Sequence, residues 1–323
     1  GRAPFETILS HGFVVDGKGL KMSKSLGNIM APEDILKKYG ADILRIWVAA
    51  SDYSEDLRID NSILEQHAES YRKIRNTFRY VLGNINDKFE KIDFAKLEIS
   101  NFPELEQYML NKIFHLNLRF IKNFENYNFH SLYKDLLNFC TVDLSAFYFD
   151  IRKDTLYCDP INSEKRKSTL ILLNVILNSL LRWFAPILSF TTEEIYQLIS
   201  KNKKSIHLEK FLNFPQKFDN SKLNSKWEQL IKIRDICNLS IEQKRASKDI
   251  GSSLEAALIV KLNNQNQKFL KNIDLSELCI TSSVKIENGD TNDIIVETSK
   301  AKGEKCPICW KIRSAPCERP NCK

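Results

Sequence analysis

Two lysines and two serines stand within five consecutive residues, Lys21-Met22-Ser23-Lys24-Ser25, with Gly19 before them and Gly27 after. Ammonium groups on a loop of this kind can neutralise the charge that develops on a leaving pyrophosphate, and hydroxyls can support the phosphates. The pattern therefore favours a loop that holds a triphosphate. The competing interpretation, a solvated basic turn, suits any generic stretch of lysine and serine.

A second candidate site is a metal centre near the end of the sequence, formed by Cys306, Cys309, Cys317 and Cys322. Four thiolates are the donor set of a closed, structural zinc site, and a Cys-x-x-Cys opening indicates metal in a reducing compartment more than a disulfide framework. We expect one structural zinc ion. The second pair is spaced Cys-x4-Cys, which leaves a free thiol at Cys317, or reduced and unliganded cysteines, as alternatives.

Two further features could contact a polyanion. Arg72, Arg75 and Arg79 follow one another at steps of three and four residues, so on a helix they share one face. A solvated basic face explains that spacing equally well. Trp310, among Lys305, Lys311 and Arg313, offers either a stacking platform for an unstacked RNA base or simple packing over the cysteines. The formal net charge of +7 is compatible with such a partner but does not establish one.

The elements that must position these residues are mainly helical. Residues 5–20 read as extended segments joined by a tight turn, Pro32 to Gly40 as a short capped helix, and Asp42 as the start of another. Ser62-x-x-Glu65 and Thr191-x-x-Glu194 have the form of capping boxes. Helical periodicity is found at 62–82, 104–124, 129–150 and 165–184, which predicts a helical bundle.

The rest of the chain reads as a smaller mixed region. We expect a linker near Phe214-Pro215, a helix over about 221–246, and strands at 254–262, 278–286 and 294–298. The apolar stretch 170–190 contains Asn174, Asn178 and Arg182, so we interpret it as a buried helix and not as a membrane span. His67 and the tryptophans Trp47, Trp183 and Trp227 are assigned to packing.

The context of the loop, from His11 to Asn28, resembles the signature loop of the class I aminoacyl-tRNA synthetases along its whole length. Further similarity is to the isoleucyl branch of that family; valyl and leucyl relatives share the loop but differ at Trp47-Val48-Ala49. The similar segments are 32–35, 40–49, 51–53, 71–77, 182–190, 251–256 and 303–306, which span nearly the whole chain.

This resemblance implies the activation of isoleucine with ATP and magnesium, followed by transfer to isoleucine tRNA. By the resemblance, Lys24 stabilises the transition state of pyrophosphate displacement, while Lys21, Ser23 and Ser25 support the phosphates. The backbone of Gly12, Phe13 and Val14 would contact adenine, and Asn28 would shape the turn. The helical bundle would be the anticodon-binding domain, which favours the interpretation of Arg72, Arg75 and Arg79 as tRNA contacts.

The fold class expected from these observations is mainly α. The end of a class I catalytic domain (1–60) is followed by an anticodon-binding bundle (61–214), a mixed α/β domain (215–300) and a zinc-binding segment (301–323). We expect a cytoplasmic monomer without membrane contact. None of the five histidines forms the His-x-Gly-His motif with which the family grips ATP, and the nucleotide-binding sheet and the editing domain are not represented in the sequence. We therefore expect a C-terminal fragment that forms no adenylate alone.

Three alternatives stay open at this point. One is a valyl or leucyl synthetase. Another is a non-catalytic tRNA-binding protein that has kept the helical and cysteine-rich parts, and the third is a zinc-ribbon nucleic-acid module unrelated to aminoacylation. The intact Lys/Ser loop argues against the last two, because a binding module has no need of it.

Overall fold

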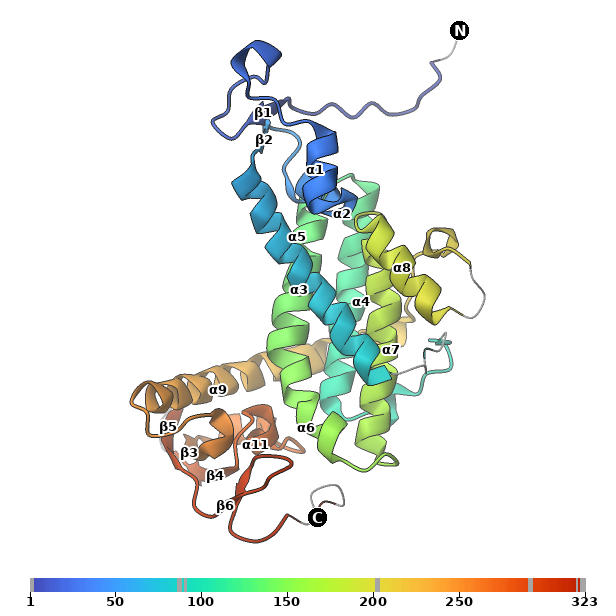
Figure 1. The fold of residues 1–323 in the computed structure, drawn as a ribbon. Helices are drawn as coiled ribbons and strands as arrows, with labels where there is room; N and C mark the ends of the chain where they lie inside the picture. Colours follow the sequence, from blue (N-terminus) through green and yellow to red (C-terminus); the bar gives the residue numbers. More distant parts are fainter. Residues whose placement is uncertain are drawn as a thin grey trace. The chain divides into compact units, whose positions relative to one another are not determined.

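A computed structural model describes residues 3–85, 89, 92–200, 204–289, 293–317 and 319 (Figure 1). The chain forms two compact units. Unit 1 comprises Gly1–Ile92, His115–Leu144 and Leu173–Asn213, and unit 2 comprises Asp93–Phe114, Ser145–Leu172 and Phe214–Lys323. The domain boundaries expected at residues 60, 214 and 300 stay predictions.

Unit 1 begins with a small α/β layer that carries the Lys/Ser loop. Strand β1 (Val14–Asp16) pairs in parallel with β2 (Leu57–Ile59). Between the two strands come the 3-10 turn Lys24–Leu26 and the helices α1 (Pro32–Tyr39) and α2 (Ala41–Ala50), which confirm both predicted helices. Buried side chains from these elements and from the start of the next helix form one apolar core: Ile35, Trp47, Leu57, Ile59 and Leu64.

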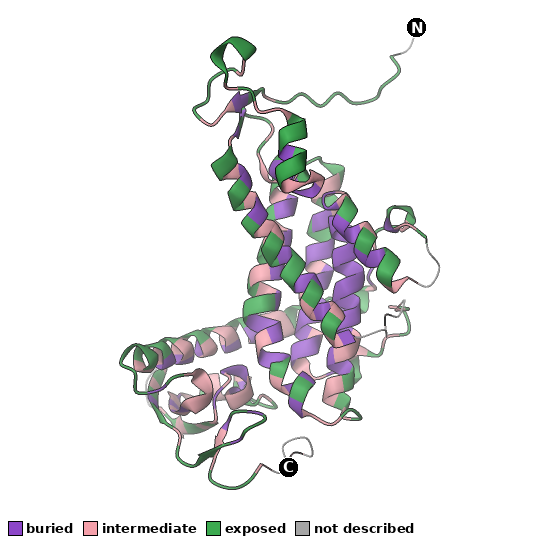
Figure 2. Ribbon diagram, viewed as in Figure 1, coloured by how far each residue is buried: buried purple, intermediate pink, exposed green. Residues whose placement is uncertain are grey.

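Long helices make up the rest of unit 1 and much of unit 2. They are α3 (Asn61–Ile85), α4 (Glu104–Glu125), α5 (Phe129–Asn138), a π-helical stretch (Phe139–Phe149), α6 (Asp150–Cys158), α7 (Glu164–Phe184) and α8 (Ser189–Ile199). In Figure 2 the buried colour is continuous along the later part of α7, whose residues Leu172, Ile176 and Leu180 have no exposed surface. The predicted buried helix is confirmed up to Phe184, where α7 ends; the last residues of the stretch 170–190 belong to the break before α8 and to its start, and Phe190 is 67% exposed. Trp47, Trp183 and Trp227 are core residues.

The mixed part of unit 2 places a three-stranded sheet against a long helix. Strand β3 (Ala256–Leu262) lies between β4 (Ser283–Asn288), its parallel neighbour, and β5 (Ile295–Lys300), its antiparallel neighbour. Helix α9 (Ser221–Ala246) packs against β3 and β5. Smaller elements are α10 (Asn264–Phe269), α11 (Leu275–Leu278), β6 (Glu304–Lys305), β7 (Ile312–Arg313) and 3-10 turns at Ile99–Asn101, Ile206–Leu208, Gln216–Phe218 and Ser253–Glu255. The predicted fold class, mainly α with a mixed segment, is confirmed.

Several local predictions were wrong, each for a physical reason. Ser62 does not cap α3, because Asp60 accepts from Ile63 N and from Ser62 Oγ, both at 2.8 Å. Thr191 does not cap α8, which begins at Ser189. The strand expected from residue 278 starts at Ser283, because Asp274 caps the short helix α11 just before it.

The expected linker near residue 214 is instead packed inside unit 2. Phe214 is 6% and Phe218 2% exposed, and the ring of Phe94 lies 4.8 Å from that of Phe214, centroid to centroid. Across the part of the chain that the structure describes, every helix is too short or too polar to cross a membrane.

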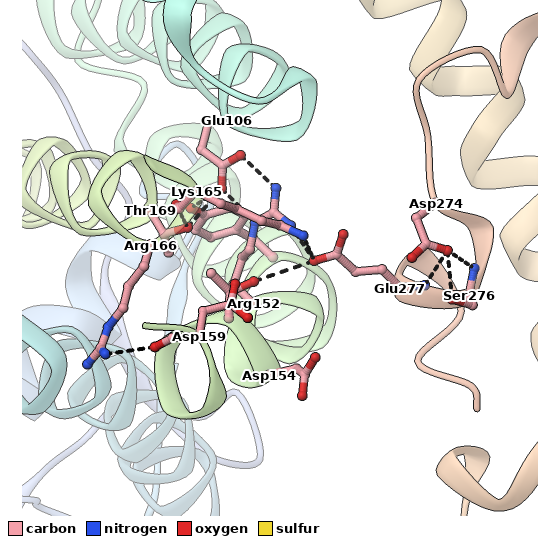
Figure 3. A network of polar contacts seen from close by, with 12 residues as sticks. Glu106, Arg152, Asp154, Asp159, Lys165, Arg166, Thr169, Asp274, Ser276 and Glu277 are labelled. Atoms are coloured by element: carbon pink, nitrogen blue, oxygen red, sulfur yellow. Dashed lines mark hydrogen bonds and ion pairs between the residues drawn. The ribbon is translucent and has the colours of Figure 1, made fainter. Parts of the chain in front are cut away.

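A buried ionic network ties the helices of unit 2 together (Figure 3). Arg152 on α6 is 3% exposed and donates to both carboxylate oxygens of Glu106 on α4 at 2.6 Å, and to Glu277 on α11 at 2.7 Å. Burial by itself would lower the pKa of the Arg152 guanidinium, but Glu106 and Glu277 raise it above its ordinary value. Tyr148 and Thr169 also donate to Glu106, at 3.0 and 3.2 Å, which satisfies that buried carboxylate.

Candidate functional site

The Lys/Ser loop is held by Asp16 and Asn28, one on each side of it. Asp16 accepts from the amides of Lys18 and Leu20, at 3.0 and 2.8 Å, and from Asn28 Nδ2 at 2.8 Å. Asn28 also accepts from Ser23 N at 2.9 Å. The hydrogen bond from Asn28, followed by that from Leu20, lowers the pKa of the Asp16 carboxyl. Asn28 thus shapes the turn, and the aspartate before Gly17, typical of an Asx turn, is a positioning residue that sequence reasoning missed.

Within this frame the loop leaves its charged groups in solvent. Lys21 and Lys24 are exposed, whereas Met22 between them packs against the core that contains Trp47. Ser23 Oγ accepts from Leu26 N at 3.3 Å and lies 3.1 Å from Ser25 Oγ, and Gly27 closes the turn with a φ of 64°. The structure therefore brings the four predicted phosphate-binding side chains into one short exposed turn anchored from below.

The segment predicted to contact adenine lies directly before this turn. The amide of Gly12 donates to Tyr53 O and that of Phe13 to Asp56 Oδ1, both at 2.8 Å. A Cβ on Gly12 would stand 2.1 Å from the carbonyl oxygen of Glu55, so only glycine fits here. Phe13 is 81% and Val14 41% exposed, which leaves this edge of the small sheet open.

The predicted basic face exists on α3. Arg72, Arg75 and Arg79 are all exposed along this helix, as is Lys73. Arg72 pairs with Glu69 one turn earlier, so part of its charge is compensated. His67, on the same helix, is half-buried, and burial lowers its pKa.

Three of the four predicted metal ligands come together in unit 2. The Sγ atoms of Cys306, Cys309 and Cys317 all lie within 4.8 Å of one another, and Cys322 lies outside the described residues. The backbone of residues 306–311, which contains the first pair, forms a tight turn in which Cys306 N donates to Lys311 O and Trp310 N to Cys306 O, both at 2.9 Å. Thiolates bound to one zinc at about 2.3 Å stand roughly 4 Å apart, so this cluster fits a zinc site.

The surroundings of this cluster differ in part from expectation. Trp310 is 59% exposed, with a φ of 62°, and Lys305 Nζ lies 5.9 Å from its ring centroid. Lys311 is buried and lies 3.9 Å from Asp154, so it is not part of an exposed basic surface. Cys158, at the end of α6, packs against the cysteine cluster; nothing in its spacing from the others signals that position.

Two segments of the chain match known families. The family of tRNA synthetases class I (I, L, M and V) matches residues 1–60, and the anticodon-binding domain of tRNA ligase matches residues 106–261. A solved structure, the ternary complex of Agrobacterium radiobacter K84 agnB2 LeuRS, tRNA and LeuAMS, has a TM-score of 0.49 at 14% identity over 79% of this chain and 25% of that one.

Curated relatives cover nearly all of this chain. Isoleucine–tRNA ligase of Pelagibacter ubique (strain HTCC1062) is 67% identical over 319 residues, which are 99% of this chain and 35% of the relative. The ligases of Agrobacterium fabrum (strain C58 / ATCC 33970) and Bartonella henselae (strain ATCC 49882 / DSM 28221 / CCUG 30454 / Houston 1) are 40% and 39% identical over 97% and 96% of this chain. The chain spans about a third of the length of these relatives, in their C-terminal portion.

A catalytic-domain end that carries the Lys/Ser loop, together with an anticodon-binding helical region, defines the class I aminoacyl-tRNA synthetases. Within that class, the chain belongs to the isoleucine–tRNA ligase family, as a C-terminal portion. The predicted resemblance to the isoleucyl branch is thereby confirmed, and a zinc-ribbon module unrelated to the synthetases is excluded.

Proposed function

We propose that this chain is part of an enzyme that activates isoleucine with ATP and transfers it to isoleucine tRNA. It supplies the Lys/Ser loop, which binds the phosphates of ATP, and the region that holds the tRNA. The observation that carries the proposal is the exposed Lys/Ser loop braced by Asp16 and Asn28, inside the segment that matches the class I family. Met22 packs against the core and anchors the loop, so the exposed Lys21 and Lys24 are held where a phosphate can reach them.

In the proposed reaction the loop stabilises negative charge on the phosphates of ATP. The ammonium of Lys24 stabilises the negative charge that grows on pyrophosphate as it leaves, and Lys21 shares that charge. The hydroxyls of Ser23 and Ser25 donate to phosphate oxygens, and magnesium accompanies ATP as a counterion. Because the amides of Gly12 and Phe13 are engaged within the protein, adenine would be recognised by other backbone atoms of residues 12–14.

The tRNA contacts are proposed for two places, one in each unit. On α3, Arg75 and Arg79 present charge to the phosphate backbone, and Arg72 does so in competition with Glu69. In unit 2, the exposed ring of Trp310 with Lys305 beside it suits an unstacked base.

The cysteine cluster is proposed to hold one structural zinc ion through Cys306, Cys309, Cys317 and Cys322. A closed set of thiolates supplies folding free energy to a short segment and no catalysis. Three thiols that approach one another this closely fit a reducing compartment, and we extend the proposal to a cytoplasmic enzyme. We propose a monomer, since one copy of the whole enzyme carries both the loop and the tRNA-holding helices.

The proposal is tested by Lys24→Ala in the full-length ligase that contains this sequence. Loss of one preorganised charge at the transition state is expected to reduce isoleucine-dependent ATP–pyrophosphate exchange about 10²- to 10³-fold, with the KM for isoleucine nearly unchanged. Lys18→Ala, an exposed lysine in the neighbouring turn, is the matched control and should stay within about twofold. Equal rates for the two variants would refute the role of Lys24.

A further inference from the structure

Two segments that carry no chemistry in the proposed mechanism, residues 40–49 and 182–190, meet inside unit 1. Asp42 on α2 is 8% exposed, and its Oδ2 accepts from Thr191 N at 2.8 Å and from Thr191 Oγ1 at 2.6 Å. Its Oδ1 accepts from Phe190 N at 3.2 Å. The carboxylate that caps α8 therefore comes from a helix about 150 residues earlier in the chain, and not from α8 itself.

On the same helix, the positively charged Arg45 binds the residues between α7 and α8, just before α8 begins. Arg45 donates through Nε to Ile187 O at 2.9 Å and through a terminal nitrogen to Pro186 O at 2.5 Å. A helix start presents amides that favour an anion, and the carbonyls just before it favour a cation. Asp42 and Arg45 lie one turn apart on α2. Asp42 thus accepts from the first amides of α8, and Arg45 donates to the carbonyls between α7 and α8.

Other hydrogen bonds join the helices around α2 and hold its far end. Tyr71 on α3 is hydrogen-bonded to Thr191 Oγ1 at 2.9 Å, and at the far end of α2 the carbonyl of Ala50 lies 2.5 Å from His130 Nδ1 on α5. These hydrogen bonds are directional and fix the relative positions of the groups that they join, whereas apolar packing is not directional. Helix α2 therefore cannot shift against α5 or α8 without breaking its hydrogen bonds, and α3 is joined to the same junction through Thr191.

The same helix also supports the Lys/Ser loop. Met22 of the loop and Met30 just after it pack against the core that contains Trp47, and Trp47 Nε1 donates to Arg58 O at 2.9 Å beside the loop's sheet. A continuous set of contacts therefore runs from the loop through Trp47 to Asp42 and Arg45, and on to the start of α8.

We infer that Asp42 and Arg45 are positioning residues that fix the Lys/Ser loop relative to the helices of unit 1, and that they serve the transfer of isoleucine to tRNA rather than its activation. This inference rests on the proposed function. Activation needs the loop and the rest of the catalytic domain. Transfer also needs the tRNA, which the helices hold, to place its acceptor end correctly against the adenylate. If the loop and the helices shift relative to one another, kcat for transfer to tRNA should fall, because small displacements of reacting groups slow a reaction strongly. The KM for tRNA should stay nearly unchanged.

The test compares neighbouring threonines on α8 in the full-length ligase. Thr191→Val removes the hydroxyl that joins Asp42 and Tyr71, whereas Thr191→Ser keeps it. Thr192→Val is the matched control, because Thr192 is also buried but its hydroxyl donates to Leu188 O at the start of its own helix. Arg45→Ala is a second, surface-exposed variant that should fold even if Thr191→Val does not.

Thr191→Val removes a hydrogen bond to the buried Asp42 carboxylate, and Arg45→Ala removes the charged hydrogen bonds to Pro186 O and Ile187 O. Each is expected to lower kcat for aminoacylation about tenfold. Pyrophosphate exchange should stay within about twofold, and Thr191→Ser and Thr192→Val should match the parent in both assays. Equal losses in both assays, or no loss in either, would overturn the inference and leave the proposed function standing. Absence of isoleucine-dependent exchange in the parent enzyme would overturn the proposed function, and this inference with it.

Discussion

His67 shows how burial, and not charge, sets the behaviour of a single residue on the basic helix. Burial lowers the pKa of its imidazole, so the folded chain holds it neutral where the unfolded chain takes up a proton. We therefore expect the free energy of unfolding to fall as the pH drops from about 6.5, the ordinary value for histidine, through the lowered folded value. Urea titrations of the chain between neutral pH and pH 5 would measure this, with unfolding of α3 followed spectroscopically.

His67→Gln should flatten that part of the pH profile, because the substituted side chain does not titrate. His11→Gln is the control, since His11 is exposed in the structure. A profile that keeps its full slope in His67→Gln would assign the acid sensitivity to another group.

Among the elements, α6 carries a charged side chain, Arg152, that is almost fully buried. Arg152→Met leaves Glu106 buried without its cation, which is expected to destabilise unit 2 by about 3–5 kcal/mol. The double variant Glu106→Gln with Arg152→Met removes both charges and should be markedly less destabilised. Chemical unfolding monitored at Trp227, a buried residue of unit 2, would measure both.

Lys153→Ala is a matched control for that pair of variants. Lys153 lies next to Arg152 on α6 and pairs with Asp150 at 2.7 Å, but both side chains are largely exposed. Its loss should change the free energy of unfolding by less than about 1 kcal/mol. A double variant as unstable as Arg152→Met would contradict the assignment of the cost to an unpaired buried charge.

The cysteine cluster is the element that metal removal should affect. One zinc per chain is expected by elemental analysis, and a strong chelator should increase proteolysis after residue 300 while the helices stay intact, because a segment this short has little core of its own. Cys309→Ser should lose the metal and Cys140→Ala, which alters a buried thiol of unit 1, should keep it. Zinc retained in Cys322→Ser would show that the closing Cys-x4-Cys pair does not complete the site.

How far sequence predicts these elements depends on whether the deciding interaction is local. Periodicity located α3, α7 and α9, because an apolar stripe is a property of adjacent turns. The start of α8 was mispredicted because its cap is Asp42, which no window around Thr191 contains. The packing of Phe214 onto Phe94 and of Cys158 onto Cys309 is equally non-local. The Lys/Ser loop was found because its residues are contiguous, whereas the role of Asp16 in bracing it appears only in three dimensions.

At the scale of the whole molecule, the proposed function assigns to this chain a tRNA-holding surface and only part of an active site. Its net charge is +7, and none of its histidines forms a His-x-Gly-His motif. We therefore expect the isolated chain to bind isoleucine tRNA, with an affinity that falls steeply as salt increases, and to catalyse no isoleucine-dependent pyrophosphate exchange. Filter binding over a range of salt concentrations and an exchange assay on the same sample would measure the two properties.

The salt dependence separates specific contacts from general charge. Arg75→Ala and Arg79→Ala should each reduce the slope of log K against log salt by about 0.7–0.9, the value expected for one lost phosphate contact. Lys96→Ala removes the same charge from a side chain that is 86% exposed in unit 2, and should leave the slope nearly unchanged. If all three variants reduce the slope equally, the arginine face of α3 acts only through net charge. Pyrophosphate exchange by the isolated chain would contradict the expectation that this chain binds tRNA but cannot activate isoleucine, since the loop would then function without the rest of the catalytic domain.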